Sequence, residues 1–476
     1  MKKRYILILF GILFISACTN DITRFNDETK RASEIPPGPL FSNAVKSMSD
    51  GLASASVNVN IFRHFVNHWA QAIIQEEAQY DYITRSIHNA WWTRMYRDVL
   101  NDLKESARII TNDATLNPTQ KANQLAMVDI MQVYAYNILI TTFGDVPYTQ
   151  ALDDKILFPV YDDAKTINDD LMRRLADDIT KLNTAAPGFT SSEDILFHGS
   201  VSKWISFANS LQIRMAMTIA DVDNAGAKAA FEKANPNAIN STANDAFIKY
   251  FSATPNNNPL YDQLVLAGRT DYIAAKDLMD VLNNYADPRK PGFFGVNNAG
   301  EYVGGIMGVP SDYPKMSKPS ARVAAPDAPN VLIDYVEMEF YRAEAKERGY
   351  TVTGSAESHY NNAVKASIIY WGGTNTDADI YLLRPDVAYT TATGGWKQKI
   401  GFQKWIALYN RPFEGWLEVR RLDFPQLTLP VNAISGFPNR LKYPGNEQQL
   451  NGTNYTNASA KIGGDKSETK LFWDIF

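Results

Sequence analysis

The sequence predicts a mainly α-helical protein with little β structure and one long loop-rich face. Apolar side chains recur at steps of three and four residues in several segments, which is the spacing of a helix with one buried side. One further segment is apolar nearly all round, as expected of a central helix. The stretch from about 236 to 330 is rich in Asn, Pro and Gly, and this composition predicts loops. A loop region of this length is more often functional than idle.

The central helix is bounded by residues that start and stop helices. Asn117 and Pro118 form an N-cap and first-turn pair, and Gly144 is expected to end the helix in a left-handed cap, so we place it at 118–143. Helical spacing predicts the other helices at 92–110, 167–182, 204–219, 274–285, 334–348, 356–370, 397–409 and 413–421. The small and aromatic residues of 334–370 are placed as in a tetratricopeptide helix pair.

The N-terminus has the pattern of a secretory signal. Cations at positions 2–4 precede an apolar run over 5–15, which is too short to span a bilayer permanently. Cys18, the only cysteine of the chain, follows directly after small residues, and the segment resembles a bacterial lipoprotein signal. We therefore expect residues 1–17 to be cleaved, Cys18 to carry acyl chains such as palmitate, and residues 18–40 to form a tether. The alternative is an ordinary secreted protein in which Cys18 is incidental.

Composition and charge exclude several classes of partner. The formal net charge is −5 and no basic cluster is present, which argues against nucleic acid. With no cysteine after Cys18, the body has no disulfide and no cysteine-ligated metal. We expect no cofactor. Aromatic residues make up 12% of the chain, and composition leaves open whether they pack the core or stack on a ligand such as a sugar.

One histidine pair has the spacing of a zinc motif. His64 and His68 are one helical turn apart, as in H-E-x-x-H, but Phe65 stands where that motif has its glutamate. We favour ordinary helix-surface or core histidines and expect no metal.

One segment partly matches a calcium-binding loop. In 221–232 the first, third, sixth and twelfth positions fit an EF-hand, but Ala225 offers no side-chain oxygen at the fifth. The competing interpretation is that Asp223 or Asn224 caps a helix over 227–233.

No catalytic signature is present in the sequence. There is no G-x-S-x-G elbow, and the 52 acidic residues offer too many carboxylate pairs for sequence to select one. We therefore expect a protein that is not an enzyme.

Five segments together resemble one protein family. TTFGDVPYTQAL (141–152) resembles the Y-G-D-x-P-Y turn of the SusD/RagB family of outer-membrane nutrient-binding lipoproteins, with Phe143 in place of the more usual Tyr. The later landmarks follow in the same order: EMEFYRAEAKERGY (337–350), QKWIALYNRPFEGWLEVRRLDFPQL (403–427), NRLKYPGNEQQLN (439–451) and LFWD (471–474). With the lipoprotein signal, the resemblance covers essentially the whole chain.

The resemblance implies a SusD-like helical fold, with tetratricopeptide-like helix pairs as scaffold, over residues 41–476 as a single domain. It implies a lipoprotein held on the cell surface in the outer membrane, which binds an oligosaccharide or, in some members, a peptide. The implied partner is a SusC-like TonB-dependent transporter that receives the nutrient, and members of the family are not catalysts. The landmarks identify the fold and not the ligand, because ligand choice in such a scaffold lies in loops.

Candidate ligand-binding residues are aromatic rings outside the clear helical stripes. Sugars present hydroxyls to polar side chains and an apolar face to aromatic rings. The candidates are the rings of Tyr80, Tyr82, Trp91, Tyr272, Trp371 and Trp396, with Asn89 and Arg269 as polar partners. The competing interpretation is that each ring packs on the scaffold, since large apolar groups are usually buried.

Two other classes of protein remain as alternatives to a binding protein. A surface-anchored enzyme that degrades glycans requires two carboxylates facing each other in a deep cleft. A scaffold that binds only protein requires a surface without an exposed aromatic platform.

Overall fold

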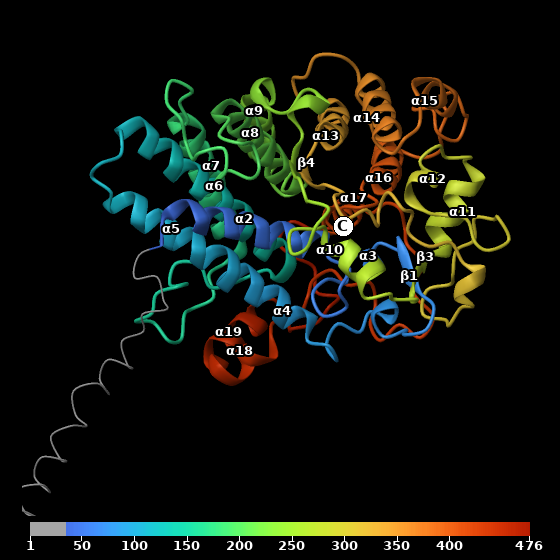
Figure 1. Ribbon diagram of the computed structural model, residues 1–476, viewed down its shortest axis with the longest axis horizontal. Coiled ribbons are helices and arrows are strands. Elements are labelled where there is room, and N and C mark those ends of the chain that lie inside the picture. The colour runs from blue at the N-terminus through green and yellow to red at the C-terminus, as the bar shows by residue number, and fades with distance from the viewer. Residues whose placement is uncertain (1–34) are drawn as a thin grey trace, which may run out of the picture.

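The computed structural model describes residues 35–476, and its architecture is mainly α, as the sequence predicts (Figure 1). The predicted signal peptide, Cys18 and most of the predicted tether lie outside the described residues. The helices are α2 (Pro37–Ala53), α3 (Phe62–Phe65), α4 (Ile87–Thr93), α5 (Asn101–Asn112), α6 (Pro118–Phe143), α7 (Ala164–Lys181), α8 (Val201–Thr218), α9 (Asn224–Ala234), α10 (Pro259–Tyr261), α11 (Lys276–Asn284), α12 (Lys290–Phe293), α13 (Tyr335–Glu347), α14 (Ala356–Tyr370), α15 (Asn375–Leu382), α16 (Trp396–Ala407), α17 (Pro412–Leu422), α18 (Gly445–Leu450) and α19 (Gly452–Lys461).

Helix α2 begins inside the segment that the sequence predicts to be a tether. The sequence predicts irregular chain up to residue 40, whereas α2 starts at Pro37. Proline fits the first turn of a helix because its missing N–H has no intrahelical partner there. Phe41 then stacks on Phe189, with 4.3 Å between the ring centroids. The folded body therefore already includes residues 37–40.

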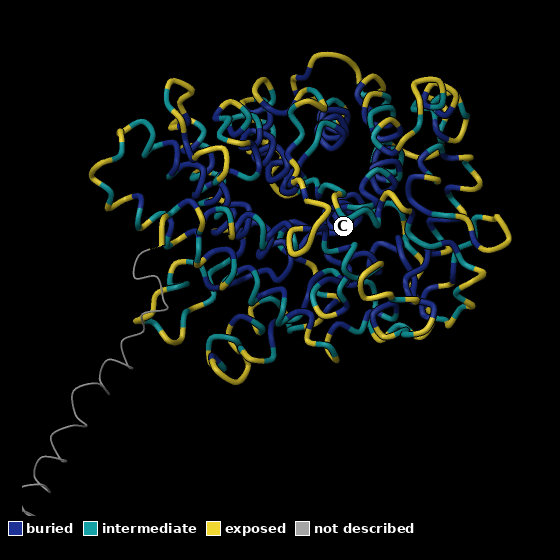
Figure 2. The backbone as a smooth tube through the Cα atoms, in the orientation of Figure 1, coloured by how far each residue is buried: buried dark blue, intermediate teal, exposed yellow. Residues whose placement is uncertain are grey.

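Helix α6 is a buried central helix, as its sequence predicts (Figure 2). Asn117 caps its start by accepting hydrogen bonds from the backbone N–H groups of Thr119 and Gln120. By length and composition, α6 is the one helix within residues 35–476 that could cross a membrane. However, 83% of its most apolar window is buried inside the protein, as expected of a core helix.

The turn after α6 requires a glycine. Gly144 has φ +87° and ψ −127°, a combination that glycine adopts readily and that residues with a Cβ avoid. The left-handed helical cap that the sequence predicts is therefore wrong in ψ, although the sign of φ is right.

A buried cluster of charges joins α8 to α13 and to the start of α17. Arg214 on α8 binds the Glu337 carboxylate on α13, with 2.7 Å between Nε and Oε1. Arg411, which precedes α17, binds the same carboxylate. The exposed fraction of these three side chains is 7% or less. One carboxylate thus holds two guanidinium groups in the core.

A second ion pair lies further along the same helices. Arg421 on α17 binds Glu344 on α13 and Glu418 on its own helix, each at 2.6 Å. Both acids and the arginine come from the segments that resemble the family landmarks. These segments therefore form the scaffold.

Helices α13 and α14 pack against each other and correspond to the predicted tetratricopeptide-like pair (Figure 1). Ser355 caps α14 in a capping box with Ser358, which fixes where the second helix of the pair begins.

Two small antiparallel sheets join distant parts of the chain. Strand β1 (Trp69–Gln71) pairs with β3 (Tyr272–Ala274), and β2 (Ala246–Ile248) pairs with β4 (Asn330–Ile333). Each strand has only three or four residues, in agreement with the little β structure that the sequence predicts. The first sheet supports a set of loops, and the second leads into α13.

Candidate ligand-binding face

Three loop segments meet beside the β1–β3 sheet, and we call them together the loop face (residues 72–86, 303–316 and 428–436). The Ser311 N–H donates to the Ala72 carbonyl at 2.8 Å. The third segment joins the other two through two further backbone hydrogen bonds of 3.0 Å, from Val431 to Met307 and from Ile434 to Gln79. Segments more than 300 residues apart are thus held as one surface.

Asp271 holds the first segment of the loop face in place through hydrogen bonds. One oxygen of its buried carboxylate accepts hydrogen bonds from the backbone N–H groups of Ile73 and Ile74, at 2.8 and 3.0 Å. The other oxygen accepts from the Gln71 side-chain amide at 3.1 Å. A short charged side chain at the start of β3 therefore fixes the loop that follows β1.

The loop face presents aliphatic side chains to solvent. Exposed fractions reach 62% for Ile73 and 60% for Ile434. The exposed aliphatic residues of the loop face are Ile73, Ile83, Ile306, Leu429, Val431 and Ile434. Apolar groups gathered on neighbouring segments are typical of a surface that contacts another molecule.

Gly308 is expected to tolerate no side chain. Gly308→Ala should lower the free energy of unfolding by about 2–4 kcal/mol, because its φ is +77° and an added Cβ would overlap the Val431 carbonyl oxygen. Chemical denaturation measures this loss. The matched control is Gly300→Ala, where φ is +81° but no atom lies within 4 Å of the added Cβ. Equal losses in both variants would contradict the role of the close approach.

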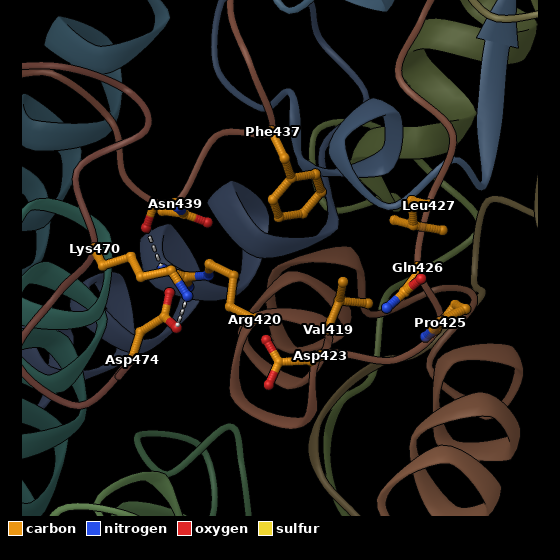
Figure 3. A pocket seen from close by; sticks show the side chains of 10 residues that line it. All are labelled: Val419, Arg420, Asp423, Pro425, Gln426, Leu427, Phe437, Asn439, Lys470 and Asp474. Carbon is orange, nitrogen blue, oxygen red and sulfur yellow. Dashed lines mark hydrogen bonds and ion pairs between the residues drawn. The ribbon is translucent and has the colours of Figure 1, made fainter. Parts of the chain in front are cut away.

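A pocket of about 220 Å³ opens beside the loop face, where α17 ends. Figure 3 shows the Phe437 ring and Leu427 on one side of the opening and the charged groups of Lys470 and Asp474 on the other. Pockets for drug-sized ligands usually have roughly 300–1,000 Å³. This pocket therefore has room for one ring-sized unit of a longer ligand.

Arg420 forms the floor of the pocket. Its guanidinium lies 3.4 Å from the Trp416 ring centroid and 4.8 Å from that of Trp473. It donates hydrogen bonds to the carbonyl oxygens of Thr141 and Asn439, at 2.9 and 2.8 Å. Burial lowers the pKa of Arg420 to about 9. The guanidinium thus serves to hold the scaffold together through these contacts.

The rim of the pocket offers the polar groups. Lys470 donates to the Asp474 carboxylate at 3.2 Å, and burial raises the pKa of Asp474. The Gln426 side chain is exposed, and Asp423 and Phe437 are half-buried. A ring face next to amide, carboxylate and ammonium groups matches the two kinds of surface that a sugar presents.

Most of the rings selected from the sequence lie in the core. Tyr80, Tyr82, Trp91, Tyr272 and Trp371 are each 6% exposed or less. Trp91 packs edge-on against Phe62, with 5.1 Å between ring centroids, and the Tyr82 hydroxyl bonds to Ser467 at 2.7 Å. The prediction that these five rings form an exposed platform is therefore wrong, and the competing interpretation, that they pack on the scaffold, is right for them.

The other three selected residues do not come together. Arg269 lies beside the loop face, where it approaches Asp271 at 3.4 Å. The Asn89 side chain accepts a hydrogen bond from the Gly445 N–H at 2.9 Å and so holds the start of α18. Trp396 is half-buried at the start of α16. Of these three, only Arg269 lies near a candidate surface.

Phe437, the aromatic ring that lines the pocket, is not among the candidates that the sequence provides. It follows Gly436 and precedes Pro438, outside any helical stripe. Trp371 and Trp396 also lie beside glycines, so the position of Phe437 in the sequence is of the same kind as theirs. What the sequence does not contain is the difference in burial between Phe437 and Trp371.

Both histidines of the zinc-like pair are core residues. His64 and His68 are each 3% exposed or less. The two ring nitrogens of His68 face the carbonyl oxygens of Tyr409 and Trp405, each at 3.1 Å, and burial lowers its pKa to about 3. Residues 35–476 contain no group of three or more His, Cys, Asp or Glu arranged to hold a metal.

The calcium-like segment is a capped helix. The Asp223 carboxylate accepts a hydrogen bond from the Gly226 N–H at 2.9 Å, and α9 begins at Asn224. Glu232 accepts instead from the Thr351 N–H at 2.7 Å. The helix-cap interpretation is therefore right, and the EF-hand interpretation is wrong.

A helical scaffold that presents a loop face and a small open pocket has the architecture of a binding protein. A family model described as SusD-like, starch-binding associating with outer membrane, matches residues 29–444. The chain therefore belongs to the SusD-like family.

Several solved structures have the same fold. One, named a chitin-binding protein, has a TM-score of 0.80 and 25% identity, and the match covers 92% of this chain and 100% of that one. A chitin-binding SusD homolog from Flavobacterium johnsoniae has a TM-score of 0.77 at 20% identity, with 91% and 98% covered. A SusD-like protein from Bacteroides thetaiotaomicron has 0.77 at 22%, with 93% and 99% covered. No curated protein matches the chain.

Proposed function

We propose that this protein is a cell-surface lipoprotein that binds an oligosaccharide and delivers it to a SusC-type TonB-dependent transporter. The observation that carries the proposal is the pocket at the end of α17, where the half-buried Phe437 ring lies beside exposed polar groups. Two relatives of the same fold are named as chitin-binding, which favours a glycan over a peptide. Titration of the mature protein with glycans and peptides tests the proposal.

The loop face is the surface that we assign to the transporter. Its aliphatic side chains, with Ile73 and Ile434 more than half exposed, provide apolar area of the kind that protein partners cover. The loop over 423–437 borders both this face and the pocket. A ligand held in the pocket would therefore lie at the edge of the contact with the transporter.

The alternative of a glycan-degrading enzyme requires two carboxylates that are free to act on one sugar. Asp245 and Asp334 line one cavity. However, Asp334 accepts hydrogen bonds from Arg411 at 2.9 Å and from the Glu337 N–H at 2.8 Å. The Oδ1 atom of Asp334 is thus already used to hold Arg411 and the start of α13. This favours a binding protein over a glycan-degrading enzyme.

Cys18→Ala tests the proposed anchor. The variant should fold normally and bind oligosaccharide with unchanged affinity, because Cys18 precedes the folded body and the pocket. Uptake of the glycan by cells should fall by at least tenfold, since the protein would no longer be tethered to the membrane beside the transporter. Chemical denaturation, calorimetry and an uptake assay measure folding, affinity and uptake, and cell fractionation shows whether the variant has left the membrane. Weakened ligand binding by the purified variant would contradict this division of roles.

A further inference from the structure

A second cavity lies between α14 and the start of α13, apart from the loop face. Its volume is about 420 Å³, within the range usual for small-molecule sites. The lining residues that matter here are Asp245, Asp334, Tyr335, Asn362, Ile369 and Tyr370. Ile369 is 46% exposed, so the cavity is open to solvent along one apolar side.

The β2–β4 sheet places two carboxylates next to each other in this cavity. Ala246 pairs with Ile333 in the antiparallel register. Asp245 directly precedes the first of these residues and Asp334 directly follows the second. The two acids are therefore cross-strand neighbours at the end of the sheet, although 89 residues separate them in the sequence. Like charges placed opposite each other in this way repel.

The two carboxylates differ in their partners. Asp334 binds Arg411 at 2.9 Å and caps α13 by accepting from the Glu337 N–H. Asp245 accepts a hydrogen bond from the Tyr335 N–H at 2.7 Å. Within residues 35–476, no ion pair includes Asp245. Asp245 is therefore the acid whose charge is least compensated.

The surrounding cluster is short of positive charge. Burial, together with the negative charge of the neighbouring Asp334, raises the pKa of Asp245 to about 8. Burial also raises the pKa values of Asp334 and Glu414. The cluster consists of the acids Asp245, Asp334, Glu337 and Glu414 and the guanidinium groups of Arg214 and Arg411. Four carboxyl groups thus share two permanent cations.

The other cations near the cavity are already engaged. The Lys365 ammonium binds Asp379 at 2.9 Å at the rim. Lys203, which acts on Asp245 only through its charge, donates to the Ala243 carbonyl at 3.2 Å. Arg322 donates to the Tyr370 carbonyl. A cation from outside would therefore meet an acid, Asp245, that none of these cations already pairs with.

We propose that this cavity binds a small organic cation, namely an ammonium group on a carbon skeleton about the size of one sugar or amino acid. The carboxylates of Asp245 and Asp334 hold the ammonium, and the ring of Tyr335, which lines the same cavity, is a side chain of the kind that attracts cations. Ile369 and Val336 supply apolar contact for the skeleton. The site lies on different elements from the pocket at Phe437, so it goes beyond the proposed function.

Cation binding at this site has a distinctive proton balance. At pH 7 the free Asp245 side chain is mostly the neutral acid, because its pKa is about 8. A bound ammonium favours the carboxylate, so the acid proton passes to the buffer as the ion pair forms. Glucosamine should therefore release a proton on binding, up to one for each molecule bound.

Glucosamine and glucose form a matched pair of probes, since they differ by one ammonium group. We expect the mature protein at pH 7 to bind glucosamine at least tenfold more tightly than glucose. Calorimetry in two buffers of different ionisation enthalpy measures both the affinity and the released proton. Equal affinity for the two sugars, or no binding of glucosamine, would overturn the proposal.

Two variants locate the site, and two are controls. Asp245→Asn keeps the acceptor for the Tyr335 N–H, and should weaken glucosamine at least tenfold and abolish proton release. Ile369→Lys changes an exposed residue and should block the site with a tethered ammonium. Glu357→Gln, which removes an exposed acid of α14 outside the cavity, and Glu105→Gln, which removes an exposed acid of α5, should leave glucosamine binding unchanged. Unchanged binding by Ile369→Lys, or weakened binding by both controls, would overturn the assignment even if Asp245→Asn did not fold.

Discussion

Glu337→Ala is expected to lower the free energy of unfolding by about 3–5 kcal/mol. The carboxylate binds both Arg214 and Arg411, and all three groups are buried. Its removal leaves two guanidinium groups in the core without their main counter-charge, and water cannot replace it. Chemical denaturation of the mature protein at pH 7 measures the loss.

The pH dependence of stability gives a second readout of the same carboxylate. Burial alone would raise the pKa of Glu337, but Arg214 and Arg411 hold it well below its ordinary value of 4.5. A lowered pKa in the folded state adds stability above pH 4.5 that is lost as the pH falls below it. The difference in stability between the wild-type protein and Glu337→Ala should therefore narrow on acidification.

An exposed acid provides the control for Glu337. Glu105 pairs with Arg108 on α5, and their side chains are 42% and 60% exposed. Glu105→Ala should change the free energy of unfolding by no more than about 0.5 kcal/mol, because solvent screens the pair. A similar loss in both variants would show that the buried cluster has no special role.

Phe437→Ala is expected to weaken oligosaccharide binding by at least tenfold, or about 1.4 kcal/mol. The ring is the aromatic surface of the pocket, and its removal takes away the apolar face against which a sugar ring can pack. Calorimetric titration with the tightest-binding glycan measures the change. The fold should be unaffected, since Phe437 is only half-buried.

The control for Phe437 removes a ring of the same type from another surface. Phe251, in the loop after β2, is 61% exposed, and Phe251→Ala should leave the affinity unchanged. If Phe251→Ala weakened binding and Phe437→Ala did not, the pocket at the end of α17 would not be the ligand site.

Elements whose signals are local could be predicted from the sequence. The capping residue Asn117 and the proline after it specify the start of α6, the apolar run to Phe143 specifies its length, and the structure confirms the bounds. The start of α2 was missed because the Pro/Gly cluster around Pro37 is typical of a linker. Its helical conformation depends on packing of Phe41 against Phe189, a contact that spans 148 residues and leaves no local signal.

The candidate site could not be predicted because ring burial depends on distant partners. The Tyr272 hydroxyl donates to the Ala55 carbonyl, and the Trp371 ring packs against Phe293 at 4.8 Å between centroids. Nothing near Tyr272 or Trp371 in the sequence distinguishes them from the half-buried Phe437. The same limit applies to Asp245 and Asp334, which only the β2–β4 register brings together.

Titration of the mature protein with a panel of oligosaccharides and peptides, followed by analysis of the length of each glycan, distinguishes glycan binding from peptide binding and from hydrolysis. The panel includes chitin and starch fragments of increasing length, with peptides of similar size. We expect at least one glycan to bind, to be recovered at its original length, and to bind at least tenfold more weakly to Phe437→Ala. Binding of peptides alone, or recovery of shortened glycans, would contradict the account of this protein as a glycan-binding member of the SusD-like family.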